Sequence, residues 1–324
     1  AMDWTKKNND GRVRKYNAFF TAQDGQLIQP NNMPYPYIIK TLMPNYREFD
    51  DTRHFFSLQK LARELGTIPD KLISPVSLNI RGQRYQAGCL LCEDGWSDNY
   101  ELEPLALLQQ NYDIDFFINS SASPYTLGKN GKRNRVFGQQ ASAAGVPLFY
   151  VNAIGLQNNG KTTYTFDGSS TAYDAEGRIA AMAPEYSESL TIIDTDSLNS
   201  PPVADIPDEP EIAHIYRALH YGIRRFLENI HMQKIVIGIS GGLDSCLALL
   251  VAVRAMKQLH RSAADVLAVT MPCFGTTKRT RSNAEILCGE LGVSFQEIRI
   301  ADTVRSHFAD IGQDETVLDV TFEN

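Results

Sequence analysis

The sequence lacks the features that would assign it to a membrane, secreted or nucleic-acid-binding class. Its longest apolar run, Cys246–Val253, is far shorter than the roughly 20 residues of a membrane-spanning helix. The first residues, Ala1–Asn9, contain no apolar stretch of a secretory signal. Basic residues are not in excess, since 31 Lys and Arg stand against 38 Asp and Glu, a net charge of −7. We therefore expect neither a membrane nor a nucleic acid as a partner.

Cysteine is also scarce. The five cysteines are odd in number and follow no spacing of a secreted disulfide framework. Hydrophobic residues make up 43% and charged residues 21% of the chain, which excludes collagen-like and wholly disordered classes. These observations favour a globular protein of the reducing cytoplasm.

One change in composition divides the chain. Residues 199–210 contain four prolines and three acidic residues, a composition that cannot continue a helix or a central strand. We therefore predict a linker over residues 199–210 between a first domain, residues 1–198, and a second domain, residues 211–324. Two domains are consistent with 324 residues.

The first region alternates strand and helix patterns, which is typical of a layered α/β domain. A hairpin is predicted over residues 17–28 around Asp24-Gly25. Further strands are predicted over 86–92, 116–119 and 147–152, helices over 103–110 and 135–144, and a closing hairpin from 163–174 and 178–183.

The second region predicts a doubly wound parallel α/β sheet. Its ligand crevice is expected at the carboxyl ends of the first two strands, near Ile239 and Met271. A capping box of Ser282 and Glu285 predicts the start of the third helix. The expected order is a helix over 211–230, a strand over 235–239, a helix over 243–259, a strand over 266–271, a helix from Ser282 to Gly292 and a strand over 294–300.

A glycine loop joins the first strand of this region to its helix. Gly241 and Gly242 allow the backbone to turn sharply and approach a ligand, and the following helix directs free N–H groups at the same point. Ser240 and Ser245 add hydroxyl groups. The loop is therefore a candidate pyrophosphate cradle. The alternative is a glycine-rich turn that binds nothing.

Asp244 is unusual in such a loop, because a carboxylate repels phosphate. A Mg²⁺ ion between the two would remove the repulsion, so we predict Asp244 as a metal ligand. The loop lacks the lysine of a P-loop, and Ser240 breaks the G-x-G-x-x-G pattern.

The stretch Ser240–Ser245 resembles the pyrophosphate loop of the ATP-pyrophosphatase superfamily, which includes NAD, GMP and asparagine synthetases and tRNA thiolases. Residues 271–284, 307–312 and 319–324 are similar to NAD synthetases in particular. The resemblance implies that ATP binds at Gly238, Ser240, Gly241, Gly242, Asp244 and Ser245, with Met271 near the adenine.

The first domain contains the pair Cys89 and Cys92. A metal or redox pair is disfavoured, because strand residues three apart point to opposite faces and no second cysteine pair completes a zinc site. We interpret Cys89 as a small core residue. From its local sequence alone, Cys92 stays open between a structural thiol and a catalytic one.

The segment Cys92–Trp96 resembles the nucleophile region of nitrilase-type glutaminase domains, and Ile38–Phe49 resembles their lysine segment. The resemblance implies Cys92 as nucleophile and Lys40 as the lysine of a Glu-Lys-Cys triad, with Glu48 an acidic residue near the site. A lysine beside a thiol also lowers the thiol's pKa and stabilises the oxyanion. The triad's glutamate is expected before residue 1.

The same resemblance implies a glutamine site. Glu93 and Tyr46 are expected to face the substrate, and Ser123 and Lys129 to contact the glutamine backbone.

Together these resemblances imply a partial chain of the glutamine-dependent NAD⁺ synthetase family, with further segments expected beyond both ends. Such an enzyme uses glutamine, ATP, Mg²⁺ and deamido-NAD⁺ as small-molecule partners, and we expect it to form a homo-oligomer. Two alternatives stay open. One is another glutamine-fed adenylating enzyme of the GMP synthetase type, and the other is a catalytically silent binding fragment.

Overall fold

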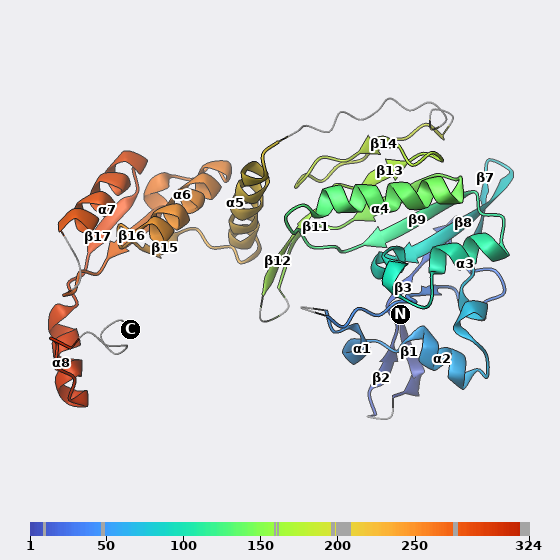
Figure 1. The fold of residues 1–324 in the computed structure, drawn as a ribbon, viewed down its shortest axis with the longest axis horizontal. Helices are drawn as coiled ribbons and strands as arrows, with labels where there is room; N and C mark the ends of the chain where they lie inside the picture. The colour runs from blue at the N-terminus through green and yellow to red at the C-terminus, as the bar shows by residue number, and fades with distance from the viewer. Residues whose placement is uncertain are drawn as a thin grey trace. The chain divides into compact units, whose positions relative to one another are not determined.

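The computed structural model describes residues 1–8, 11–46, 49–158, 160, 162–195, 198, 209–274 and 278–317. The chain divides into two compact units, residues 1–209 and 210–324 (Figure 1). The predicted linker over residues 199–210 lies outside the described residues except at Glu209 and Pro210.

The first unit is built on a six-stranded sheet. The strand order is β14-β13-β10-β9-β8-β7, and β8, β9 and β10 run parallel while the other pairs are antiparallel. Parallel neighbours require crossover helices, which α3 and α4 supply (Figure 1). The bounds are β7 Val76–Ile80, β8 Gln83–Leu91, α3 Pro104–Asn111, β9 Phe116–Ser121, α4 Lys129–Ala144, β10 Leu148–Asn152, β13 Thr171–Tyr173 and β14 Ile179–Met182.

The core of this unit lies between the sheet and its helices. Phe117 of β9, Phe137 of α4 and Leu148 of β10 are fully buried in one cluster. Burial alternates from residue to residue along β9, because successive strand residues point to opposite faces of the sheet.

Short elements complete the first unit. The predicted hairpin around Asp24-Gly25 is confirmed as β4 and β5, and both turn residues have positive φ. The remaining bounds are β1 Met2–Lys7, β2 Val13–Lys15, β3 Ala18–Phe19, β4 Thr21–Gln23, β5 Gln26–Ile28, β6 Ile38–Ile39, α1 Asp51–His54, α2 Leu58–Glu64, β11 Ile154–Asn158 and β12 Thr163–Asp167, with 3-10 turns η1 Pro69–Leu72, η2 Cys92–Gly95 and η3 Ser97–Asn99.

Two predictions for this unit were wrong in detail. Residues 163–174 do not form one strand, because Gly168 has a φ of +72° and separates β12, which pairs with β11, from β13, which pairs with β14. The helix predicted over 135–144 begins six residues earlier, at Lys129, because left-handed Gly128 turns the chain into it.

The second unit contains a three-stranded parallel sheet in the order β15-β16-β17, which confirms the predicted α/β class. Leu249 and Met256 of α6 and Ala268 of β16 are fully buried in its core. The bounds are α5 Glu211–Asn229, β15 Ile235–Gly238, α6 Leu243–Gln258, η5 Ala263–Asp265, β16 Val266–Thr270, α7 Lys278–Leu291, β17 Ser294–Glu297 and α8 Ala301–Ile311.

The predicted start of the third helix was wrong. Helix α7 begins at Lys278, so Ser282 lies inside the helix and not at its N-cap. Strand β15 is partly exposed, with Val236 69% exposed. No helix in the described part of the chain is both long and apolar enough to cross a membrane.

Candidate active site

The predicted nucleophile lies at a sharp turn. Strand β8 ends at Leu91, and Cys92 follows with a φ of +48°, a left-handed conformation that is uncommon outside glycine and often found at functional sites. Gly95 completes the turn in a place where a Cβ would overlap the side chains of Asn119 and Phe137. The local sequence therefore fits a backbone that projects one thiol from the strand end.

Cys92 opens onto a cavity of about 670 Å³. Glu93, Tyr46, Ser123 and Lys129, all four predicted glutamine contacts, line the same cavity. Segments far apart in the sequence thus meet at one pocket. Glu48 lies outside the described residues.

Lys40 is buried and is not among the residues that line this pocket. Its side chain is 4% exposed and its Nζ donates to Asp51 Oδ2 at 2.6 Å. Burial raises the pKa of the Cys92 thiol, while the Lys40 charge and hydrogen bonds from Ala122 and Ser121 act in the opposite direction. The net direction is upward, so the expected acidification by Lys40 is outweighed by burial. Such a thiol needs a proton acceptor when it attacks.

Glu93 presents a buried carboxylate to the pocket. Tyr46 Oη donates to both of its carboxylate oxygens at 3.0 and 3.1 Å, and Tyr100 Oη donates to Oε1 at 2.9 Å. The tyrosines stabilise a negative charge at a place that is 7% exposed. A carboxylate positioned in this way is suited to a substrate ammonium group.

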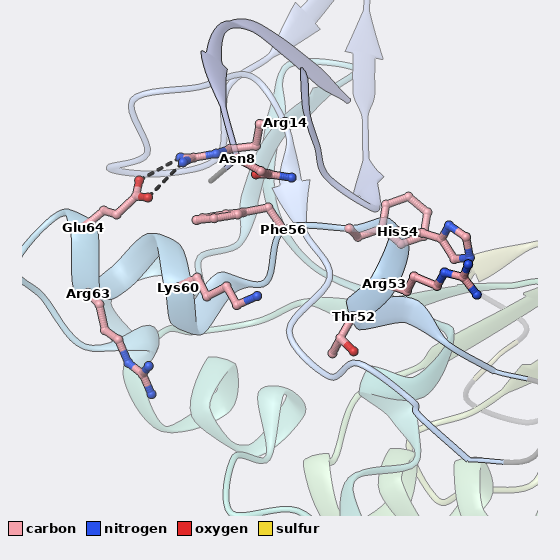
Figure 2. A pocket seen from close by; sticks show the side chains of 10 residues that line it. Asn8, Arg14, Thr52, Arg53, His54, Phe56, Lys60, Arg63 and Glu64 are labelled. Carbon is pink, nitrogen blue, oxygen red and sulfur yellow. Dashed lines mark hydrogen bonds and ion pairs between the residues drawn. The ribbon is translucent and has the colours of Figure 1, made fainter. Parts of the chain in front are cut away.

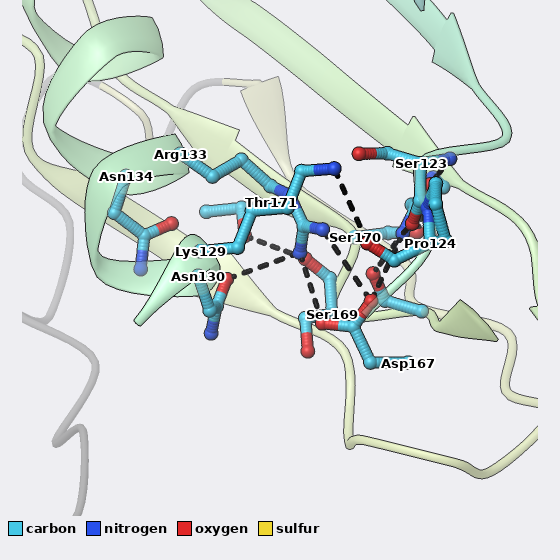
Figure 3. Close-up of polar contacts among 12 residues, drawn as sticks. Ser123, Pro124, Lys129, Asn130, Arg133, Asn134, Asp167, Ser169, Ser170 and Thr171 are labelled. Carbon is cyan, nitrogen blue, oxygen red and sulfur yellow. Dashed lines mark hydrogen bonds and ion pairs between the residues drawn. The ribbon is translucent and has the colours of Figure 1, made fainter. Parts of the chain in front are cut away.

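A buried polar network supports the Ser123 side of the pocket. Asn152 accepts a hydrogen bond from Ser123 N at 2.9 Å and donates to Ser123 O at 3.3 Å. Asn152 also donates to Asp167, which forms an ion pair with Arg133 at 3.1 Å (Figure 3). Arg133 and Asp167 are 0% and 2% exposed. Lys129 Nζ donates to Pro124 O at 3.2 Å from the first turn of α4.

The sequence analysis missed three polar groups at this site. Asp51 pairs with Lys40, Tyr100 binds Glu93, and Lys132 lines the pocket with its Nζ 5.5 Å from the centre of the Trp96 ring. A usable signal was present for Asp51, since two acidic residues directly follow the lysine segment. Nothing local marks Tyr100 or Lys132.

The predicted phosphate loop lies at the end of β15. Gly241 has a φ of +80°, and Gly242 is the N-cap of α6. Ser240 N donates to Ser245 Oγ at 3.2 Å, and the two hydroxyls lie 3.1 Å apart. A Cβ on Gly238 would be 4.0 Å from Met271 Cε, so Met271 borders the loop as expected from its place at the next strand end.

Asp244 lies exposed in the first turn of α6. Among the described residues, no three His, Cys, Asp or Glu side chains gather closely enough to bind a metal. Mg²⁺ nevertheless fits this setting, because it is commonly bound by one or two carboxylates together with substrate phosphates.

A second cavity of the first unit, about 450 Å³, contains none of the predicted residues. Arg14 forms two hydrogen bonds to Glu64 and lies 3.7 Å above the Phe56 ring (Figure 2). The paired charges lower the pKa of Glu64. We interpret this cavity as a structural feature.

Comparison with known proteins supports both halves of the resemblance. The NAD synthase family model matches residues 215–324. Glutamine-dependent NAD(+) synthetase of Synechocystis sp. is 28% identical over 92% of this chain and 49% of its own length. The Thermotoga maritima protein of the same name is 27% identical over 90% of this chain and 50% of its own length. The chain thus spans about half the length of these relatives.

Solved structures of glutamine-dependent NAD⁺ synthetases are similar to this chain as well. The structure of glutamine-dependent NAD+ synthetase from Acinetobacter baumannii in complex with ADP superposes with a TM-score of 0.76 and 28% identity, covering 98% of this chain and 54% of that chain. The Cytophaga hutchinsonii synthetase shares the fold, with a TM-score of 0.66 and 14% identity over 94% of this chain and 52% of that chain.

Fold and site together define an α/β chain in which a unit built on a six-stranded mixed sheet precedes a segment that matches the NAD synthase family and contains a parallel sheet. The chain is a homologue of glutamine-dependent NAD⁺ synthetases and covers about half of the full-length enzymes.

Proposed function

We propose that the first unit hydrolyses glutamine and that the second supplies part of an ATP-dependent synthetase site. The observation that carries the proposal is the pocket in which Cys92, Glu93, Tyr46, Ser123 and Lys129 meet. Its lining carries both signs of charge, which is complementary to the zwitterionic end of a free amino acid.

Glutamine hydrolysis would proceed through a thioester. Cys92 Sγ attacks the side-chain carboxamide carbon, the C–N bond breaks, and the nitrogen leaves as ammonia after it gains a proton. Water then cleaves the thioester to give glutamate and the free thiol. Lys40 is charged and buried nearby, so it would stabilise the negative oxygen of each tetrahedral intermediate.

The second unit would bind ATP at the loop between β15 and α6. Gly241, Gly242 and the N-terminus of α6 offer backbone N–H groups to the phosphates. Asp244 would hold Mg²⁺, which neutralises phosphate charge when bound. The product of the complete reaction would be NAD⁺, formed after the nicotinate carboxylate of deamido-NAD⁺ is adenylated, with AMP and pyrophosphate released.

Ammonia release from glutamine tests the first half. Cys92→Ala should lose activity by on the order of 10³-fold or more, as expected for removal of a nucleophile. Cys89→Ala is the matched control, because Cys89 is a buried thiol three residues earlier on β8 and lies outside the pocket. Equal activity of the Cys92 variant and the parent would contradict the assignment.

The second half is tested by product formation with ATP, Mg²⁺ and ammonia. Deamido-NAD⁺ should give NAD⁺ and pyrophosphate in the complete enzyme. Turnover of a purine monophosphate instead would favour the GMP synthetase type, and no nucleotide binding at all would favour a silent fragment.

A further inference from the structure

The carboxylate of Asp94 joins two segments that carry the predicted catalytic groups. Its Oδ1 accepts the N–H groups of Thr41 at 3.0 Å and Leu42 at 2.8 Å, and its Oδ2 accepts the N–H of Leu91 at 3.2 Å. Thr41 directly follows Lys40, and Leu91 directly precedes Cys92. One side chain, 2% exposed, therefore ties the backbone next to the lysine to the backbone next to the thiol.

No sheet ladder among the described strands performs this task. Strand β6, which ends just before Lys40, pairs with β3, whereas β8, which ends just before Cys92, pairs with β7 and β9. Among the described residues, the other hydrogen bonds between the two segments run to Glu93 from the hydroxyl of Tyr46, a residue that is 47% exposed. Asp94 is thus the buried connection between them.

The same carboxylate stabilises the unusual turn. Its bond to Leu91 N closes a ring over Cys92, the residue with a φ of +48°. Short local bonds of this kind maintain conformations that the backbone does not otherwise favour.

We propose that Asp94 is a positioning residue: it sets the placement of Lys40 relative to Cys92 and maintains the left-handed turn that presents the thiol. This role rests on the proposed function of Cys92 as the nucleophile.

The proposal predicts the direction in which loss of the Asp94 carboxylate shifts the pKa of the Cys92 thiol. Three titratable groups act electrostatically on the Cys92 thiol: Lys40, which follows β6, Glu93 of η2 and the Tyr150 hydroxyl of β10. Lys40 is itself paired with Asp51 of α1. If Asp94 positions Lys40, loss of its carboxylate weakens the influence of the Lys40 charge and raises the pKa of the thiol. If Asp94 acted only through its own negative charge, its removal would lower that pKa.

Alkylation of Cys92 by iodoacetamide, followed against pH by mass spectrometry of its peptide, separates the two cases. In Asp94→Asn, which keeps the shape and removes the charge and one acceptor, alkylation near pH 8 should slow by roughly tenfold, corresponding to about one unit in thiol pKa. Unchanged or faster alkylation would overturn the proposal.

The matched control is Asp174→Asn. Asp174 is 0% exposed and accepts the N–H groups of Glu176 at 3.1 Å and Arg178 at 2.7 Å. Its buried carboxylate therefore also fastens a turn, but far from Cys92 in the sheet order. Its variant should lose stability and leave Cys92 alkylation within about twofold of the parent. Equal slowing in both variants would show a general loosening and reject a specific role.

Amide hydrogen exchange of the parent chain gives an answer even if Asp94→Asn does not fold. The N–H groups of Thr41, Leu42 and Leu91 should exchange as slowly as those of β8 and β9. Rapid exchange of Thr41 and Leu42 would refute the link. Both measurements are independent of glutamine turnover, so a parent chain without glutaminase activity would count against the proposed function alone.

Discussion

In the first unit, the turn at Cys92 and the backbone of Ser123 are held by buried side chains, Asp94 and Asn152. In the second unit, Ser240 lies on an exposed loop and Asp244 in the exposed first turn of α6. The first arrangement depends on long-range polar contacts such as Asn152 with Ser123. The second depends on backbone conformation and on hydrogen bonds within six consecutive residues. The proposed thiol site and the proposed phosphate site are thus built by different means. Substitutions of the same kind should therefore have very different effects in the two units.

Removal of a carboxylate should give the largest difference in stability loss between the two units. Asp167→Ala leaves Arg133, which is 0% exposed, without its ion-pair partner, and we expect a loss of about 3–5 kcal/mol in the free energy of unfolding. Asp244→Ala removes an exposed carboxylate and should change it by about 0.5 kcal/mol or less. Urea unfolding of the two variants measures both values. Similar losses would show that the two sites are not built differently.

The pH dependence of stability should show the effect of burying a carboxyl group in the first unit. Burial raises the pKa of Asp94 to about 7. A raised carboxyl pKa means that the folded state binds more protons than the unfolded state, so its contribution is complete below the unfolded pKa near 4 and is lost as pH rises through about 7.

Between about pH 5 and about pH 8, the parent should therefore lose about 2–3 kcal/mol relative to Asp94→Asn. The measurement is the difference in unfolding free energy between the two proteins at each pH. A constant difference would contradict the assigned burial effect.

Substitution of glycine by alanine should also destabilise the first unit more than the second, by a smaller amount than removal of a carboxylate. In Gly95→Ala, the new methyl group would overlap Asn119 and Phe137, and overpacking of this sort costs about 1–3 kcal/mol. In Gly242→Ala, the nearest atom to the new Cβ is Ser240 Oγ at 3.3 Å, so we expect a loss of about 1 kcal/mol or less. Thermal unfolding of the two variants compares them. A larger loss of stability in Gly242→Ala than in Gly95→Ala would contradict the view that the first site is the more tightly packed of the two.

The smallest effect is expected for ligand binding at the second unit. Asp244→Asn should weaken Mg²⁺-ATP binding several-fold, about 1 kcal/mol, and leave metal-free ATP binding equal or slightly tighter, because a repulsion is removed. Gly241→Ala should weaken both equally, since its φ of +80° disfavours a side chain. Titration of each variant with and without Mg²⁺ separates the roles. Unchanged Mg²⁺-ATP binding by Asp244→Asn would remove the metal assignment.

What the sequence could predict follows the same division. The glycine loop and the parallel order of its strands were predictable, because they depend on local turns and on strand–helix alternation. Resemblance of short segments also identified five of the residues that line the Cys92 pocket, namely Tyr46, Cys92, Glu93, Ser123 and Lys129. The contact of Tyr100 with Glu93 was not predictable, because it depends on how the turns η2 and η3 fold between the two residues, and no local pattern marks it.

The direction in which the pKa of Cys92 is shifted could not be predicted from the sequence either. A lysine nearby in a motif indicates a lowered thiol pKa, but the extent of burial is set by the whole fold. The break at Gly168 was similarly hidden, because a long polar and aromatic stretch reads as one strand until its two partners, β11 and β14, are known.

Covalent capture of Cys92 tests the central claim most directly. A chloroketone analogue of glutamine combines the amino-acid end with an electrophilic carbon at the position of the carboxamide. Mass spectrometry of the treated chain should find one label, on Cys92, and glutamine but not asparagine should protect against it. Labelling spread over Cys89, Cys246, Cys273 and Cys288, or labelling of Cys92 that glutamine does not slow, would contradict a glutamine pocket at this thiol.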